Sequence, residues 1–154
     1  MPGLIDYGCS VADVYRRYHD IHGAIFGAAS YRIIIDALRG RRRRIYHDHA
    51  QVLVGLRAEL AGYEREITDL VEAGPMKATD REIHRVLLDY LRVLDGAIND
   101  LFAIFDNLQR DETRYRDVGA DGHSRFSNDK RLYDRHLSEL ERLGTRLNRL
   151  FTSY

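Results

Sequence analysis

A dense cluster of arginines lies near residue 40 of the chain. Five arginines fall within six positions, and two histidines follow at positions 47 and 49. Guanidinium groups bind phosphates and carboxylates through paired, charge-assisted hydrogen bonds, so this cluster is suited to an anionic partner. A neighbouring tyrosine ring offers a surface on which a nucleic-acid base can stack. The residues that we expect to contact such a partner are Arg39, Arg41, Arg42, Arg43, Arg44 and Tyr46.

Three interpretations of the arginine cluster remain open at the level of sequence. The cluster is a solvated turn, or it binds the phosphates of a nucleic acid or another polyphosphate, with an affinity that falls as salt rises. Alternatively, it pairs with an acidic surface on another protein. The whole chain carries 24 basic and 24 acidic residues and no net charge. Any affinity for a polyanion must therefore be local.

The segment from Arg42 to His49 reads Arg-Arg-Arg-Ile-Tyr-His-Asp-His. It resembles the signature of HEPN-domain ribonucleases, in which four to six residues separate an arginine from a histidine. Those proteins are helical bundles, often toxins, that cleave RNA without a metal. The resemblance implies a catalytic pair in which Arg42 binds the scissile phosphate and His47 acts as acid or base near neutral pH.

Histidines offer a second chemistry, because one falls on each of four predicted helices. In an up-down-up-down bundle, His49 and His136 each lie about eight residues from the same end, which predicts that the two rings meet across the core. Facing imidazoles suit a bis-histidine haem or, with a third ligand, a metal ion. Di-iron carboxylate chemistry needs Glu-x-x-His pairs, and the sequence contains none. The four histidines are His22, His49, His84 and His136.

Other motifs exclude several classes of function. The sequence has no phosphate-binding loop, dinucleotide fingerprint, Gly-x-Ser-x-Gly motif or cysteine pair for zinc. The single cysteine, Cys9, permits no internal disulfide, which suits a reducing compartment. The sequence has no secretory signal pattern, and no apolar stretch approaches about 18 residues. We therefore predict a cytoplasmic protein with no cofactor and no membrane partner.

Apolar residues recur at spacings of three and four along almost the whole chain, which predicts helices and leaves little room for strands. Ser10 with Asp13 and Thr79 with Glu82 form capping-box-like pairs at two predicted helix starts. The second helix is expected to bury Ile45, His49, Val52, Leu56, Leu60, Tyr63, Ile67 and Leu70. The predicted helices run from Ser10 to Gly40, from Ile45 to the stop at Gly74-Pro75, from Thr79 to Arg116 and from about Asn128, with residues 1–9 as a tail and 117–127 as a loop.

Four long helices with short connections predict an all-α fold, an antiparallel up-down-up-down bundle in a single domain spanning residues 1–154. Gly40 is the weakest of the predicted breaks, since its neighbours lack turn-forming side chains. The first two helices can therefore also form one long bent helix. An unbroken rod of about 60 residues would be roughly 90 Å long. It would place Arg42 in phase with the buried stripe, so we favour a bend.

Small residues on the first predicted helix indicate a close contact with another helix. Gly23, Ala24, Gly27 and Ala28 form overlapping small-x-x-x-small pairs, which suit a close helix contact within the chain or with a second copy in a symmetric dimer. The sequence thus predicts a non-enzymatic binding or scaffolding bundle, homo-oligomeric, that contacts a nucleic acid or an acidic protein through its arginines. The alternatives are the HEPN-like ribonuclease and the haem-binding or metal-binding bundle.

Overall fold

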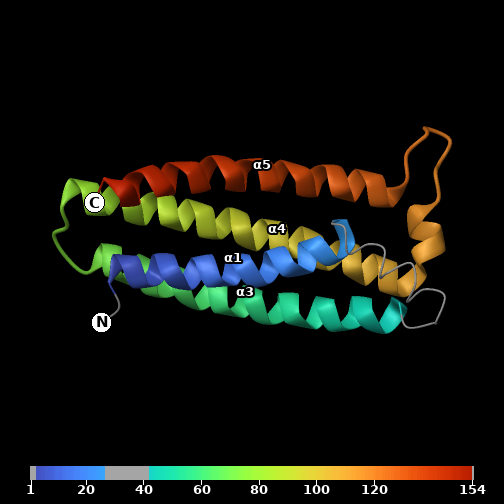
Figure 1. Cartoon of the computed structure of the whole chain (residues 1–154), viewed down its shortest axis with the longest axis horizontal. Helices are drawn as coiled ribbons and strands as arrows, with labels where there is room; N and C mark the ends of the chain where they lie inside the picture. Colours follow the sequence, from blue (N-terminus) through green and yellow to red (C-terminus); the bar gives the residue numbers. More distant parts are fainter. Residues whose placement is uncertain (1–2, 27–41, 154) are drawn as a thin grey trace.

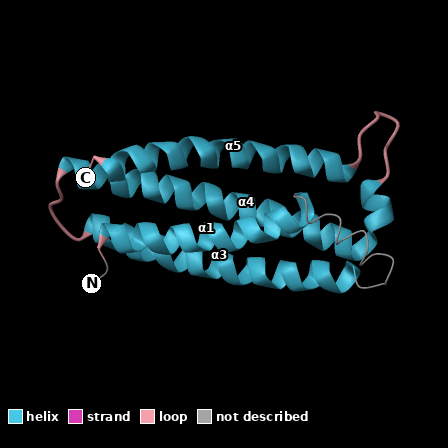
Figure 2. Ribbon diagram, in the orientation of Figure 1, coloured by secondary structure: helices cyan, strands magenta, loops and turns pink. Residues whose placement is uncertain are grey.

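The structure is a computed structural model that describes residues 3–26 and 42–153 of the chain. The described residues form helices α1 (Leu4–Phe26), α3 (Arg42–Glu72), α4 (Ala78–Arg116) and α5 (Arg125–Thr152). Helices α1 and α4 run in one direction and α3 and α5 in the other (Figure 1), and loops join α3 to α4 and α4 to α5 (Figure 2). The predicted all-α four-helix bundle is confirmed. Whether the chain bends at Gly40 lies outside the described residues.

Helix α4 is the central element of the bundle, because it packs against α1, α3 and α5. Neither α1 nor α3 makes a comparable helix pair with α5. The buried side chains of α4 follow the three-four spacing that the sequence predicts. Tyr90, which the same spacing also places on this face, is only partly buried. Each such aliphatic or aromatic side chain contributes about 1.5–3 kcal/mol when it is fully removed from water. The main buried residues of α4 are Ile83, Leu87, Leu91, Leu94, Ile98, Leu101, Phe105 and Leu108.

The first helix begins at Leu4, six residues before the predicted start at Ser10. The carboxylate of Asp6 accepts a hydrogen bond from the backbone N–H of Gly3 at 2.7 Å, which caps the helix from its third residue. Leu4 and Tyr7 are buried, so residues 4–9 are part of the bundle rather than a tail. The Ser10 hydroxyl donates to the carbonyl of Asp6 one turn earlier and caps nothing.

Two other predicted helix starts are shifted. Helix α4 begins after Lys77, whose side chain makes no capping hydrogen bond, so the predicted capping box of Thr79 and Glu82 is absent. Helix α5 begins at Arg125, three residues before Asn128, because Ser124 and Ser127 form a reciprocal capping box. The loop between these helices is therefore shorter than predicted.

The buried face of α3 differs from the predicted one over its first half. Tyr46, Ala50 and Leu53 are buried there, whereas Val52 is 48 % exposed. One residue turns a helix by about 100°, so a shift of one position moves the buried face by more than a quarter turn. From Leu56 to Ile67 the buried positions agree with the predicted stripe.

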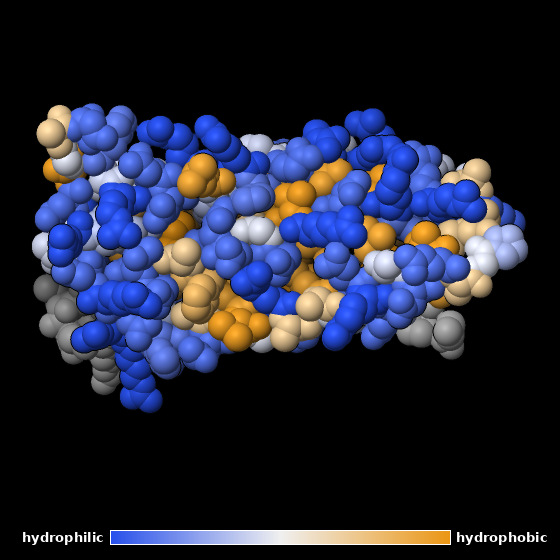
Figure 3. Space-filling view, turned by 180° about the vertical axis from the view of Figure 1, so that it is seen from behind, coloured by the Kyte–Doolittle hydropathy of each residue, from blue (hydrophilic) through white to orange (hydrophobic). Residues whose placement is uncertain are grey.

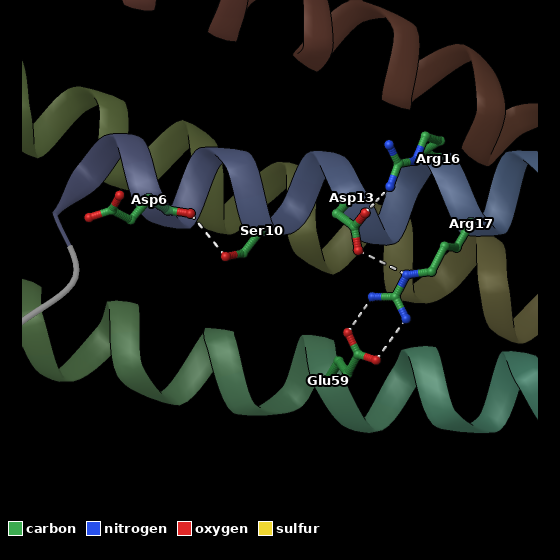
Figure 4. Close-up of polar contacts among 6 residues, drawn as sticks. All are labelled: Asp6, Ser10, Asp13, Arg16, Arg17 and Glu59. Carbon is green, nitrogen blue, oxygen red and sulfur yellow. Dashed lines mark hydrogen bonds and ion pairs between the residues drawn. The ribbon is translucent and has the colours of Figure 1, made fainter.

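Ion pairs join α1 to α3 and α3 to α4 at the rim of the core. Arg17 of α1 donates two hydrogen bonds to the carboxylate of Glu59 on α3, at 2.9 and 2.5 Å, and also pairs with Asp13 (Figure 4). Arg57 of α3 binds Asp95 of α4 at 2.9 Å. These side chains are partly exposed, so each pair contributes at most about 1 kcal/mol. Figure 3 shows hydrophilic atoms over most of the opposite face, with hydrophobic atoms in patches between them.

Candidate functional site

The described part of the arginine cluster lies at the beginning of α3. Arg43 and Arg44 are exposed, and the first turn of α3 contains no acidic residue. Arg39 and Arg41 lie outside the described residues, and of Arg42 the structure describes only the backbone. The N-terminus of a helix carries a partial positive charge, which these arginines reinforce. This end of α3 therefore concentrates positive charge.

Tyr46, which the sequence places on the contact surface, is buried. Its ring is 1 % exposed and packs against Phe105 of α4, with ring centroids 5.8 Å apart. Its hydroxyl donates a hydrogen bond to Glu112 Oε1 at 3.3 Å. The aromatic face is consequently not presented to a stacking base, because this position belongs to the buried stripe of α3.

Arg42 and His47, the pair implied by the HEPN resemblance, are both on α3. Four residues separate them, so their Cα atoms lie about 140° apart around the helix axis. His47 is exposed, and its Nδ1 lies 3.2 Å from the side-chain nitrogen of Gln109 on α4. The side chain of Arg42 lies outside what the structure describes, so the pairing of Arg42 with His47 stays a prediction.

His49 and His136 do not meet across the core. Helices α3 and α5 each pack on α4 and not on each other. The ring of His49 lies 5.4 Å from that of Phe105, and burial lowers the pKa of His49. The ring of His136 instead binds Asp100, with Nδ1 2.5 Å from a carboxylate oxygen. Among the described residues, no group of three or more histidine, cysteine, aspartate or glutamate side chains is arranged to hold a metal ion.

A hydrogen-bonded group that no sequence motif indicates joins α1 to α5. The Tyr133 hydroxyl on α5 contacts the Tyr18 hydroxyl and lies 2.8 Å from His22 Nδ1, both on α1. Burial, followed by the nearby His19, lowers the pKa of His22, so its ring is neutral at pH 7 and Nδ1 can accept the Tyr133 proton. Tyr18 then donates to Tyr133, so that each of the two hydroxyl hydrogens has an acceptor.

Beside this group, the seam between α1 and α5 is open. Two adjoining cavities of about 480 and 440 Å³ lie along it, with α4 at their base. We call them together the α1–α5 groove. Tyr15, Tyr90, Gly144 and Asn148 line both cavities. The first cavity is mainly apolar, and the second contains His19, His22 and Glu141.

Two glycines face the α1–α5 groove from its opposite walls. Gly8 and Gly144 are 136 positions apart in the sequence. An ideal Cβ on Gly8 would lie 3.0 Å from the ring of Phe151, on the opposite wall. Only the folded bundle brings these positions to one seam.

Comparison of the chain with protein-family models, curated proteins and solved structures found no match. Among the described residues, no helix combines the length and apolar character needed to cross a membrane.

Proposed function

We propose that the protein is a non-enzymatic binding module that holds the phosphate backbone of a single-stranded nucleic acid. The contact surface is the arginine segment, defined as Arg39 and Arg41 to Arg44. The observation that supports this proposal is the first turn of α3, which contains no acidic residue and exposes Arg43 and Arg44.

The electrostatics of a helix end favour an external anion at this position. Cations beside the N-terminus of a helix are unfavourable by about 0.3–1 kcal/mol each, whereas anions there are favourable by a similar amount. Neither Arg43 nor Arg44 forms an ion pair with another residue that the structure describes. A bound phosphate would relieve the repulsion and accept hydrogen bonds from both guanidinium groups.

Burial of Tyr46 determines the kind of recognition that we expect. Without that ring, the segment has no described aromatic face on which a base can stack, so the contacts are with phosphates and carry little sequence preference. Binding should then depend steeply on salt. An acidic protein surface would use the same guanidinium chemistry and is the competing outcome of the experiment below.

The test is binding of a fluorescent single-stranded RNA, measured by anisotropy across a salt series. We compare the wild type with the double variant Arg43→Gln, Arg44→Gln. The matched control is Arg131→Gln, Arg135→Gln, which removes two exposed arginines of α5 that form no described ion pair. Loss of two phosphate contacts should reduce the slope of log K against log salt by about 1.4. The control should bind like the wild type.

Absence of binding at low salt, or an equal loss in both double variants, would contradict the proposal and leave an acidic protein as the partner to examine. The same RNA is run on a denaturing gel after incubation. Cleavage that His47→Ala abolishes while binding persists would replace the binding module by the ribonuclease that the HEPN resemblance implies.

A further inference from the structure

The α1–α5 groove has the size of a small-molecule site. Such sites commonly enclose about 300–1,000 Å³ and combine apolar walls with a few polar groups. The larger cavity has about 480 Å³ and is lined by apolar residues from three helices, including Val11, Leu87 and Phe151. The adjoining cavity supplies the polar groups. The groove therefore suits an elongated ligand with one apolar and one polar end.

Gly144 helps to keep the groove open at a cost to the helix. It lies inside α5, where glycine is less favourable than alanine by about 1 kcal/mol. Its φ is not positive, so the backbone does not require glycine. An ideal Cβ there would lie 3.5 Å from the ring of Tyr90, which leaves room for a methyl group but not for a longer side chain beside it.

The described lining of the groove contains few charged groups, and negative charge is in excess. Among the described residues, its lining contains one carboxylate, Glu141, and two imidazoles, but no lysine or arginine. Glu141 forms no ion pair with a described residue, and His22 is neutral at pH 7 because its pKa is lowered by burial. An anionic head group would meet an uncompensated negative charge here, whereas a cation would be paired.

Tyrosine rings reinforce the preference for a cation. The ring centroid of Tyr15 lies 5.9 Å from that of Tyr18 and 6.5 Å from that of Tyr90. All three residues line the same cavity as Glu141. The negative face of an aromatic ring attracts cations, most strongly where water is partly excluded. A carboxylate beside aromatic rings is a combination that recognises organic ammonium and phosphonium groups.

We propose that the α1–α5 groove binds a lipophilic organic cation, with its apolar body against Val11, Leu87 and Phe151 and its charge between Glu141 and the tyrosines. This site is separate from the arginine segment, so the two proposals stand or fall independently.

Cys9 provides a direct readout of occupancy. It is the only cysteine in the chain, it is exposed, and it lines the apolar cavity. We measure its rate of reaction with a colorimetric disulfide reagent in the presence of tetraphenylphosphonium or tetraphenylborate. These ions have nearly the same shape and opposite charge. Tetraphenylphosphonium should protect Cys9 saturably, and tetraphenylborate should protect it much less.

Two substitutions test the role of the Glu141 carboxylate and of the space beside Gly144. Glu141→Gln should weaken tetraphenylphosphonium binding about fivefold, whereas Glu139→Gln, on the same helix but outside the groove lining, should leave it unchanged. Gly144→Leu should abolish protection, provided that circular dichroism shows an intact helical fold. If that variant does not fold, the two glutamate variants still decide the question. Equal protection by both ions, or equal effects of Glu141→Gln and Glu139→Gln, would overturn the proposal.

Discussion

Gly96 is a residue whose presence is explained by a single neighbouring side chain. It lies in the interior of α4, and an ideal Cβ there would be 2.9 Å from His136 Nε2 of α5. The same imidazole is held by its hydrogen bond to Asp100. A methyl group at position 96 would push the ring away and weaken that bond. Gly96 therefore makes room for the His136–Asp100 pair.

If His136 explains Gly96, then Gly96→Ala should have opposite effects on stability in the presence and in the absence of the His136 ring. In the wild type, Gly96→Ala should lower the free energy of unfolding by about 1 kcal/mol, since crowding and the weakened hydrogen bond outweigh the gain in helix propensity. In the His136→Ala background, the same change should raise it by about 1 kcal/mol. Urea denaturation of the wild type, the two single variants and the double variant measures the energetic coupling between positions 96 and 136. Equal effects in both backgrounds would mean that the ring does not explain Gly96.

Residue type alone was enough to predict which charged and polar residues at the start of α3 are exposed. The position of Tyr46 depended on which face of the helix is buried. Arg43, Arg44 and His47 are exposed, in keeping with their charge or polarity. Tyr46 is amphipathic and suits either a buried or an exposed position, so its type alone could not place it. Residues 45–56 contain apolar side chains on two adjacent helical faces, and packing against Phe105 selects one of them.

Helix α1 carries the feature from which we predict self-association. An ideal Cβ on Gly23 meets no atom within 4 Å, so the close contact expected of this glycine is not made within the described chain. Gly27 and Ala28 lie outside the described residues. A second copy remains the partner that the small residues of α1 predict.

Substitution by leucine tests that prediction. Gly23→Leu should shift a dimer toward monomer in sedimentation velocity, because a large side chain prevents close approach of two helices. Gly55→Leu is the matched control, since Gly55 lies on α3 with no atom within 4 Å of an added Cβ. We expect the control to sediment as the wild type does. A wild-type protein that is monomeric at high concentration would contradict the prediction.

Helices were predictable as elements, but their ends were not. Apolar periodicity is a property of many residues and survives single exceptions, whereas a helix start depends on one or two hydrogen bonds. The pattern of Ser10 and Asp13 resembled a cap, yet Asp6 forms the actual one with Gly3. Similarly, Ser124 caps α5 together with a second serine, Ser127, where a capping box usually has glutamate or glutamine.

At the scale of the whole molecule, the α1–α5 groove could not be predicted from the sequence. It exists because α1 and α5 lie beside each other without packing closely, and helical periodicity does not determine that spacing. Its walls come from the two ends of the sequence, and they meet only through side chains such as Tyr18 and Tyr133. Sequence periodicity shows that a face is apolar. It does not show how closely two such faces approach.

Two partly buried histidines should make the stability of the whole bundle depend on pH. Burial lowers the pKa of His22 and of His49 below the ordinary value of 6.5. The unfolded chain therefore binds protons at a higher pH than the folded chain does. Stability should be constant above about pH 7.5 and should decrease as pH falls through 6.5, by at most about 1.4 kcal/mol per pH unit for each histidine. The slope should disappear below the folded-state pKa values.

Urea denaturation at pH 7.5, 6.5 and 5.5 measures this response before carboxylates contribute. Glu59, whose pKa is lowered by its hydrogen bonds to Arg17, loses its stabilising charge only below its usual value of 4.5, so it does not interfere. His22→Gln and His49→Gln should each reduce the slope of stability against pH, because each removes one ring whose burial disfavours the charged form. A wild-type protein that becomes more stable between pH 7.5 and 5.5 would show that protonated histidine is favoured by the fold, against the burial of these two rings.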